Sequence, residues 1–256
     1  MGLDEGLRAV AADANGVDAC LGLPWAGVWV WLPGGERCGL AVTLRARRLP
    51  GREQEPAVAG AGNWRRGVPS PLSACVPYGR PEASLGFDAL QATAPLDPDR
   101  WIEGVAVPVL PRRCRGKRLA WVGPFRFAAA LRALAASGVV LELEPLPGES
   151  PAERAADILP RLDLIVGTGM ALVNRTPEGR LALYSPGSEA ALVGPSLPLG
   201  EVLVDYGISL LCGCCVEQPQ RVMAGIRQGA HFHHSHPEGT RLVTMEGRAS
   251  LDSCVV

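Results

Sequence analysis

Three short apolar segments, each followed by glycine or by small polar residues, constrain this sequence more than any other feature. They are residues 164–166, 190–193 and 208–211. A short apolar run that ends at such a turn is typical of a strand buried on both faces of a parallel sheet. In an open parallel sheet, ligands bind outside the carboxyl ends of the strands, where glycine lets the backbone come close. We therefore expect the functional loops of this chain to follow these strands.

From residue 119 onward, short apolar runs alternate with segments of helical periodicity. The five runs are residues 119–122, 139–144, 162–166, 190–193 and 208–211. This alternation is typical of βαβ units, which give a parallel sheet with helices on both faces. The predicted fold class is therefore α/β, with a Rossmann-like parallel sheet domain over residues 106–256.

The first part of the chain has a different pattern, which predicts a small α+β domain over residues 1–105. Apolar residues at helical spacing predict an opening helix, and two Val- and Trp-rich runs around a Pro-Gly-Gly turn predict a β-hairpin. Residues 45–81, rich in Pro, Gly and Arg, are expected to form a long loop. A basic cluster within residues 99–117 is expected to be a solvated linker between the domains. The expected helices are residues 6–20 and 82–94, and the hairpin strands are residues 25–32 and 38–44.

Composition narrows the classes of function. The 256 residues are 47% hydrophobic, and 25 basic against 26 acidic residues leave a formal charge of −1. This balance argues against a nucleic-acid partner, which normally requires clustered Lys and Arg. No apolar stretch approaches the roughly 20 residues of a membrane span, and the acidic start does not resemble a signal peptide. We expect a cytoplasmic protein with reduced thiols among its eight cysteines. The sequence does not decide whether the chain forms a homo-oligomer.

Glycine-rich loops after the expected strands supply the candidate ligand-binding residues. The loop TGMALVN offers backbone amides at Gly167 and Gly169, a hydroxyl at Thr168 and a side-chain amide, a set suited to an anion or a carboxylate. The alternative is structural, because glycine also lets a strand and a helix pack closely and Asn can cap a helix. Ser196 follows a strand and is expected to cap the next helix. The further candidates are Gly123, Asn174 and Gly194.

A nucleotide site must also be considered in a parallel sheet. Glu144 ends the second expected strand, about 20 residues beyond the first turn, where a dinucleotide-binding domain places its ribose-binding acid. The turn itself lacks the G-x-G-x-x-G pattern, and Pro124 removes an amide donor. NAD is therefore an improbable cofactor. An enzyme acting on an adenosyl-type or other anionic small molecule stays the alternative function.

Cysteine and histidine gather near the carboxyl terminus. All four histidines lie within HFHHSH, and three cysteines lie within CGCC. Thiolate and imidazole are the ligands that soft and borderline transition metals prefer, although no C-x-x-C spacing is present. Packed thiols and a solvated turn are the alternatives. The candidate metal ligands are Cys212, Cys214, Cys215, His231, His233, His234 and His236.

The geometry of a βα unit bears on these ligands. A helix over residues 218–228 that packs antiparallel to its preceding strand would leave the histidines at the amino edge of the sheet, away from the cysteines. A site made of histidines alone, with or without Cys254, is therefore the favoured form of the metal site. No Ser-His-Asp order, HExxH motif or P-loop is present, which argues against common hydrolase and NTPase mechanisms.

An ordered set of motifs resembles the putative heavy-metal chelation domain family, formerly a domain of unknown function. The motifs are VGPFRF, LELEPLPGESPA, TGMALVN, GPSLPLGEVLVDYG and RLVTM. RCGLAVTL and EASLGFDAL in the first half resemble the family's smaller accompanying domain, which is similar to the N-terminal domain of enolase. The sequence departs from the family at Pro124, where a histidine is common, and at Gln91, where asparagine is common.

The resemblance implies two domains with a cleft between them and a role in handling metal. We accordingly expect binding of a metal ion or a metal-associated small molecule in that interdomain cleft, with a transition metal of unknown identity. An enzyme of the adenosyl type is the competing class, and a scaffold with an empty cleft is the third possibility.

Overall fold

The structure is a computed structural model that describes residues 15–44, 62–63, 81–104, 109–123, 125, 127–173, 181–232 and 239–247. The chain divides into two compact units. The first unit comprises Met1–Leu96, Pro198–Gly200 and Cys214–Arg241, and the second comprises Asp97–Leu197, Glu201–Gly213 and Leu242–Val256. Both units are therefore assembled from separate segments. The continuous domains that we expected, with a boundary between residues 105 and 106, stay a prediction.

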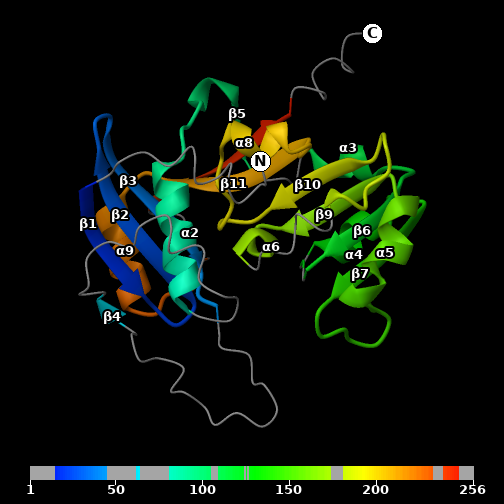
Figure 1. Ribbon diagram of the computed structural model, residues 1–256, viewed down its shortest axis with the longest axis horizontal. Helices are drawn as coiled ribbons and strands as arrows, with labels where there is room; N and C mark the ends of the chain where they lie inside the picture. Colours follow the sequence, from blue (N-terminus) through cyan, green and yellow to red (C-terminus); the bar gives the residue numbers. More distant parts are fainter. Residues whose placement is uncertain are drawn as a thin grey trace. The chain divides into compact units, whose positions relative to one another are not determined.

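A four-stranded antiparallel sheet organises the first unit (Figure 1). Its strand order is β3-β2-β1-β4. The predicted hairpin is confirmed, because β2 and β3 pair antiparallel across a tight turn at Pro33 and Gly34. The strands are β1 (Asn15–Leu21), β2 (Trp25–Leu32), β3 (Gly35–Val42) and β4 (Gly62–Asn63).

The expected opening helix is wrong for its described part. Residues 15–20 belong to β1, which pairs along its length with β2. The cross-strand pairing outweighs the local helical spacing: Ala19, Cys20 and Leu21 are buried, whereas Val17, which lies at a register shift between Gly16 and Asp18, is exposed. The remainder of the predicted helix, residues 6–14, lies outside the described residues, as does most of the loop expected at residues 45–81.

Two helices cover the two faces of this sheet. The predicted helix at residues 82–94 is confirmed as α2 (Pro81–Thr93), and its Leu85 and Ala89 pack in one cluster with Val28 of β2. On the other face lies α9 (Pro219–Arg227), so close that a Cβ added to Gly27 would lie 2.6 Å from Ile226 Cδ1. The βα pattern predicts that this helix packs on the parallel sheet, antiparallel to its preceding strand. Its apolar residues instead complete the first unit.

Helix α2 also protects the free edge of β3. Gln91 Oε1 accepts a hydrogen bond from Leu40 N at 2.5 Å, and Ser84 Oγ accepts one from Leu44 N at 2.9 Å. These side chains satisfy main-chain groups that an uncovered edge strand would present to other chains. Between them lies Asp88, which is fully buried and whose carboxylate has no hydrogen-bond partner among the described residues. Burial raises the pKa of Asp88 well above its usual value.

An eight-stranded, mostly parallel sheet organises the second part of the fold, and it confirms the predicted α/β class. Its order is β5-β12-β11-β10-β9-β6-β7-β8. The strands from β11 to β8 pair parallel, and β5 pairs antiparallel with β12. The strands are β5 (Trp101–Glu103), β6 (Arg118–Val122), β7 (Ser137–Glu142), β8 (Ser150–Pro151), β9 (Leu164–Thr168), β10 (Glu189–Val193), β11 (Leu210–Val216) and β12 (Thr240–Glu246).

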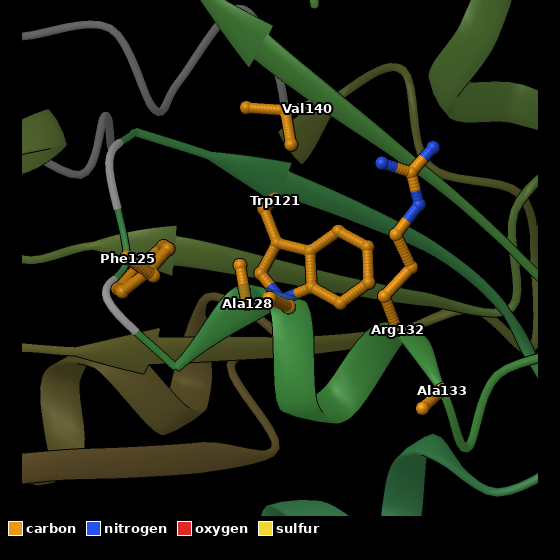
Figure 2. A pocket seen from close by; sticks show the side chains of 7 residues that line it. Trp121, Phe125, Ala128, Arg132, Ala133 and Val140 are labelled. Atoms are coloured by element: carbon orange, nitrogen blue, oxygen red, sulfur yellow. The ribbon is translucent and has the colours of Figure 1, made fainter.

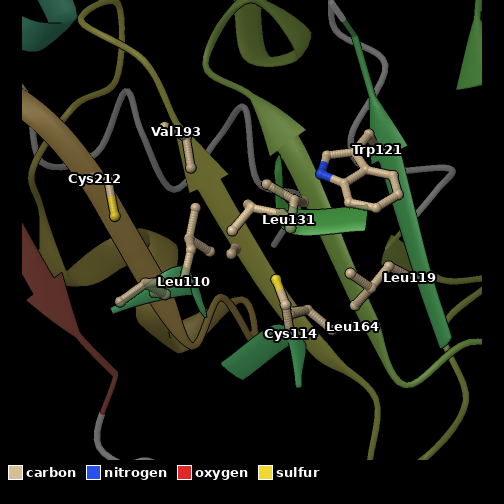
Figure 3. Close-up of a cluster of buried hydrophobic side chains, with 11 residues drawn as sticks. Leu110, Cys114, Leu119, Trp121, Leu131, Leu164, Val193 and Cys212 are labelled. Carbon is tan, nitrogen blue, oxygen red and sulfur yellow. The ribbon is translucent and has the colours of Figure 1, made fainter. Parts of the chain in front are cut away.

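Helices lie on both faces of the parallel strands, as in a doubly wound sheet. On one face, α3 (Leu110–Cys114) and α4 (Ala128–Arg132) pack on a cluster centred on Trp121 and Leu164 (Figure 3). On the other face, α5 (Ala155–Ile158) packs on Val122 and Ile165. The remaining short helices are η2 (Pro98–Arg100), η3 (Ala152–Arg154), η4 (Leu159–Arg161), α6 (Met170–Val173) and α8 (Glu201–Asp205). None of the helices in the described residues is long and apolar enough to cross a membrane.

The basic cluster expected to be a solvated linker is instead part of the second unit. Arg113 bonds Glu189 at 2.9 Å and Glu246 at 3.0 Å, and Lys117 also pairs with Glu189. Arg118 bonds Asp163 at 2.6 Å. Asp163 and Glu189 lie at the amino-terminal ends of β9 and β10, and Glu246 ends β12, so the cluster ties these strands to α3 and β6.

Candidate functional site

Loops that we predicted to bind a ligand meet at the carboxyl edge of three adjacent strands. Gly123 follows β6, Thr168 ends β9 and Gly194 follows β10. A Cβ added to Gly123 would lie 2.6 Å from Thr168 Cγ2. A Cβ added to Gly194 would lie 3.5 Å from the amide nitrogen of Gly169 and 3.9 Å from Thr168 Oγ1. The structure thus brings these four residues together.

The glycine amides at this edge continue the sheet. Gly169 N donates to Val193 O at 2.9 Å, Gly194 N donates to Cys212 O at 2.8 Å, and Gly123 N donates to Leu141 O at 3.2 Å. The hydrogen of the Gly169 amide therefore goes to the neighbouring strand, and the expected role of Gly169 in binding an anion stays a prediction. Gly123 and Gly194 have φ values of +105° and +142°, which disfavour any side chain. These glycines let neighbouring segments approach closely and let the chain turn after each strand.

Two hydroxyl groups remain at the site. Thr168 Oγ1 accepts a hydrogen bond from Met170 N at 3.3 Å, an ST-turn that leads into α6. Ser196 is 2% exposed and lies in a turn closed by a bond from Leu197 N to Gly194 O. The expected capping role of Ser196 is wrong, since α8 begins only at Glu201.

The other two candidate ligand-binding residues are Glu144 and Asn174. Glu144 is exposed and lies in the loop after β7, which ends at Glu142. Asn174 lies outside the described residues. The role of all seven candidates in binding stays a prediction.

The three cysteines predicted at the end of the fifth strand lie within β11. Cys212, Cys214 and Cys215 belong to β11, whose alternation places Cys215 on the opposite face from the other two. Cys212 is buried in the cluster that α3 covers, and burial, partly offset by a hydrogen bond from Thr244, raises its pKa to about 11. Burial also raises the pKa of Cys214 and of Cys215. Protonated thiols are poor metal ligands at neutral pH.

Of the four histidines, the structure describes one. His231 is exposed and follows α9, whereas His233, His234 and His236 lie outside the described residues. Helix α9 packs in the first unit, so it is not the helix covering the parallel sheet that the βα geometry assumed. Within the described ranges, no three His, Cys, Asp or Glu side chains group as metal ligands. The site made of histidines alone stays a prediction.

Sequence reasoning did not find a cavity of about 520 Å³ beside α4 (Figure 2). Its walls include Trp121 of β6, Val140 of β7 and Phe125 of the turn between β6 and α4. Helix α4 contributes alanines and Arg132. The alanine-rich stretch FRFAAALRALAAS was the available signal, because small side chains on one helix face leave a groove against the sheet.

The comparisons with known proteins find a matching family and structures of similar fold. The model of DUF364, a family described as putative heavy-metal chelation, matches residues 105–245. A crystal structure of a DUF364 protein of unknown function from Pyrococcus horikoshii has a TM-score of 0.74 at 19% identity, covering 95% of this chain and 98% of that one. One from Desulfitobacterium hafniense has a TM-score of 0.69 at 22% identity, covering 95% and 96%. The search of curated proteins found no match.

Proposed function

The chain belongs to the DUF364 family, described as putative heavy-metal chelation, and from this premise we propose that it binds a metal-carrying small molecule at the carboxyl edge of β6, β9 and β10. The observation that carries the proposal is the convergence of Gly123, Thr168 and Gly194 at that edge. Open parallel sheets bind their ligands at this edge. That the site also opens into a cleft between two domains stays a prediction.

The side chains favour a metal carried by an organic ligand over a bare ion. Thr168 and Ser196 offer hydroxyls, whereas soft transition metals prefer thiolate and imidazole. Within the part of the chain that the structure describes, no group of three such ligands exists. A ligand that brings its own donor atoms to the metal needs from the protein only groups that recognise the ligand's periphery.

Thr168 can recognise such a periphery. Its oxygen accepts the Met170 amide, and the hydroxyl hydrogen remains to donate to a carboxylate or phosphate oxygen. The glycines beside it carry no side chain that would occupy the edge. A small anionic chelate therefore fits the chemistry of this edge better than a large neutral one.

Elemental analysis of the purified full chain, together with mass spectrometry of the released organic fraction, tests the proposal. We expect the metal and an anionic organic compound to leave together on denaturation. Thr168→Val should lower the metal content severalfold, because it removes the hydroxyl, and Thr168→Ser, which keeps the hydroxyl, should restore it. A variant with His233→Ala, His234→Ala and His236→Ala serves as the comparison.

The outcomes separate the candidate functions. If the metal content falls in the triple histidine variant and is unchanged in Thr168→Val, the proposal is overturned and the site made of histidines alone is supported. Release of an adenosyl compound without metal would overturn it in favour of the alternative enzyme. The position of Glu144 after β7 is the observation that keeps this alternative.

A further inference from the structure

The cavity beside α4 has the lining of a small-molecule site. It is a depression that opens to solvent and has a volume of about 520 Å³. The indole of Trp121, the ring of Phe125 and the side chain of Val140 supply apolar walls. Across from them, α4 presents Ala128 and Ala129, whose small side chains leave the space open. The cavity therefore suits a flat apolar body.

Glycine shapes the strand side of this cavity. A Cβ added to Gly138 of β7 would lie 2.4 Å from Trp121 Cζ3, so only glycine lets the indole lie against that strand. The same Cβ would lie 3.5 Å from Arg132 Cγ, which places the arginine stem beside the indole. The apolar wall and the cationic side chain are thus neighbours.

Two polar groups of the cavity lining have no partner among the described residues. Trp121 is fully buried, and its Nε1 donor has no acceptor there. In Figure 2 the indole nitrogen lies on the ring edge that faces α4. Arg132 is exposed and pairs with no carboxylate in the described part of the chain.

We propose that this cavity binds a small molecule with a planar apolar body and a carboxylate, with Arg132 recognising the carboxylate and Phe125 and Val140 forming the apolar wall. The apolar lining selects the body, and the unpaired guanidinium selects the negative charge, because Arg matches a carboxylate with two parallel donors. This goes beyond the proposed function, since the site involves no metal and none of Gly123, Thr168, Gly194 or Ser196.

The test uses the full chain and the probe 2-naphthoate, titrated by calorimetry and checked by saturation-transfer NMR. We expect a dissociation constant in the millimolar range or below for a probe of this size. Arg132→Gln should weaken binding about tenfold, as expected for loss of a charged hydrogen bond. Ala129→Leu should also weaken it at least tenfold by filling the cavity from an exposed position.

A matched control and a neutral probe make the result decisive. Arg154→Gln changes an exposed arginine of η3, which precedes α5 on the opposite face of the sheet, and should leave binding unchanged. 2-Naphthalenemethanol has the same rings without the charge, so it should bind more weakly and should not respond to Arg132→Gln. Absence of naphthoate binding, or equal affinity in wild type, Arg132→Gln and Ala129→Leu, would overturn the proposal.

Discussion

The two edges of the parallel sheet are built from different chemistry. At the amino edge, charged side chains link separate segments of the fold: Arg118 of β6 pairs with Asp163 beside β9, and Arg113 of α3 and Lys117 pair with Glu189 of β10. At the carboxyl edge, the same strands end in Gly123, Thr168 and Gly194. Ion pairs join the segments at the amino edge, whereas glycines without side chains leave the carboxyl edge open.

The two edges therefore have different roles: the amino edge contributes stability, and the carboxyl edge leaves room for a ligand. Long charged side chains fill the edge that they join, and their partners fix them in place. Glycines leave the carboxyl edge open, and each positive φ there is a conformation that other residues adopt only with strain. Mutations at the amino edge should therefore change stability alone, whereas those at the carboxyl edge should change stability and binding together.

The largest effect is expected from Gly123→Ala. The new Cβ would meet Thr168 Cγ2 at 2.6 Å, and φ would stay at +105°. Strain and overpacking together should lower the free energy of unfolding by about 2–4 kcal/mol. Urea unfolding measures the loss.

Two further variants divide that loss into its causes. Gly148→Ala has a similar φ of +91° with no atom within 4 Å of the new Cβ, so it should show the strain alone, about 1 kcal/mol. Adding Thr168→Ser to Gly123→Ala removes the nearest atom and should recover most of the overpacking. If Gly148→Ala cost as much as Gly123→Ala, the close packing of β6 and β9 at this edge would be refuted.

A smaller effect is expected from Glu189→Gln at the amino edge. Burial alone would raise the pKa of Glu189, but hydrogen bonds and charges from Lys117 and Arg113 lower it overall. Neutralising a half-buried carboxylate between two cations should cost about 1–2 kcal/mol, between the values for surface and buried pairs. Urea unfolding of Glu189→Gln beside Glu153→Gln, an exposed position, provides the comparison. Equal stability of the two variants would show that the amino-edge network adds nothing.

The sequence was sufficient to predict the parallel sheet and its carboxyl-edge loops because both depend on local patterns. Buried strands such as β9 read as apolar runs, and glycines mark the turns that follow them. The ordered motifs that resemble the putative heavy-metal chelation family also predicted the family correctly. What could not be predicted depends on contacts distant in sequence. The burial of α9 against Gly27 and the pairing that makes residues 15–20 a strand are examples.

Hydrogen-bond partners at the candidate site were equally beyond the sequence. The pattern TGMALVN identifies Thr168 and Gly169, but only the register of β9 and β10 shows that the Gly169 amide bonds Val193. The role of Gln91 at the edge of β3 has the same origin, since its partner Leu40 is distant along the chain. A sequence pattern identifies such donors and acceptors, but it does not show which groups they bond.

The smallest effect is expected from the exposed pair at the amino edge. Hydrogen bonds from the Arg118 side chain and backbone lower the pKa of Asp163 from 3.8 to about 2. A lowered carboxylate pKa stabilises the fold above the unfolded-state value, and this contribution is lost as the pH falls toward the folded-state value. The stability difference between wild type and Asp163→Asn should therefore shrink from about pH 5 to about pH 2. Because the pair is exposed, 1 M salt at neutral pH should shrink it too. Urea midpoints across this pH range measure the difference, and a difference independent of both pH and salt would mean that Asp163 acts through packing instead of charge.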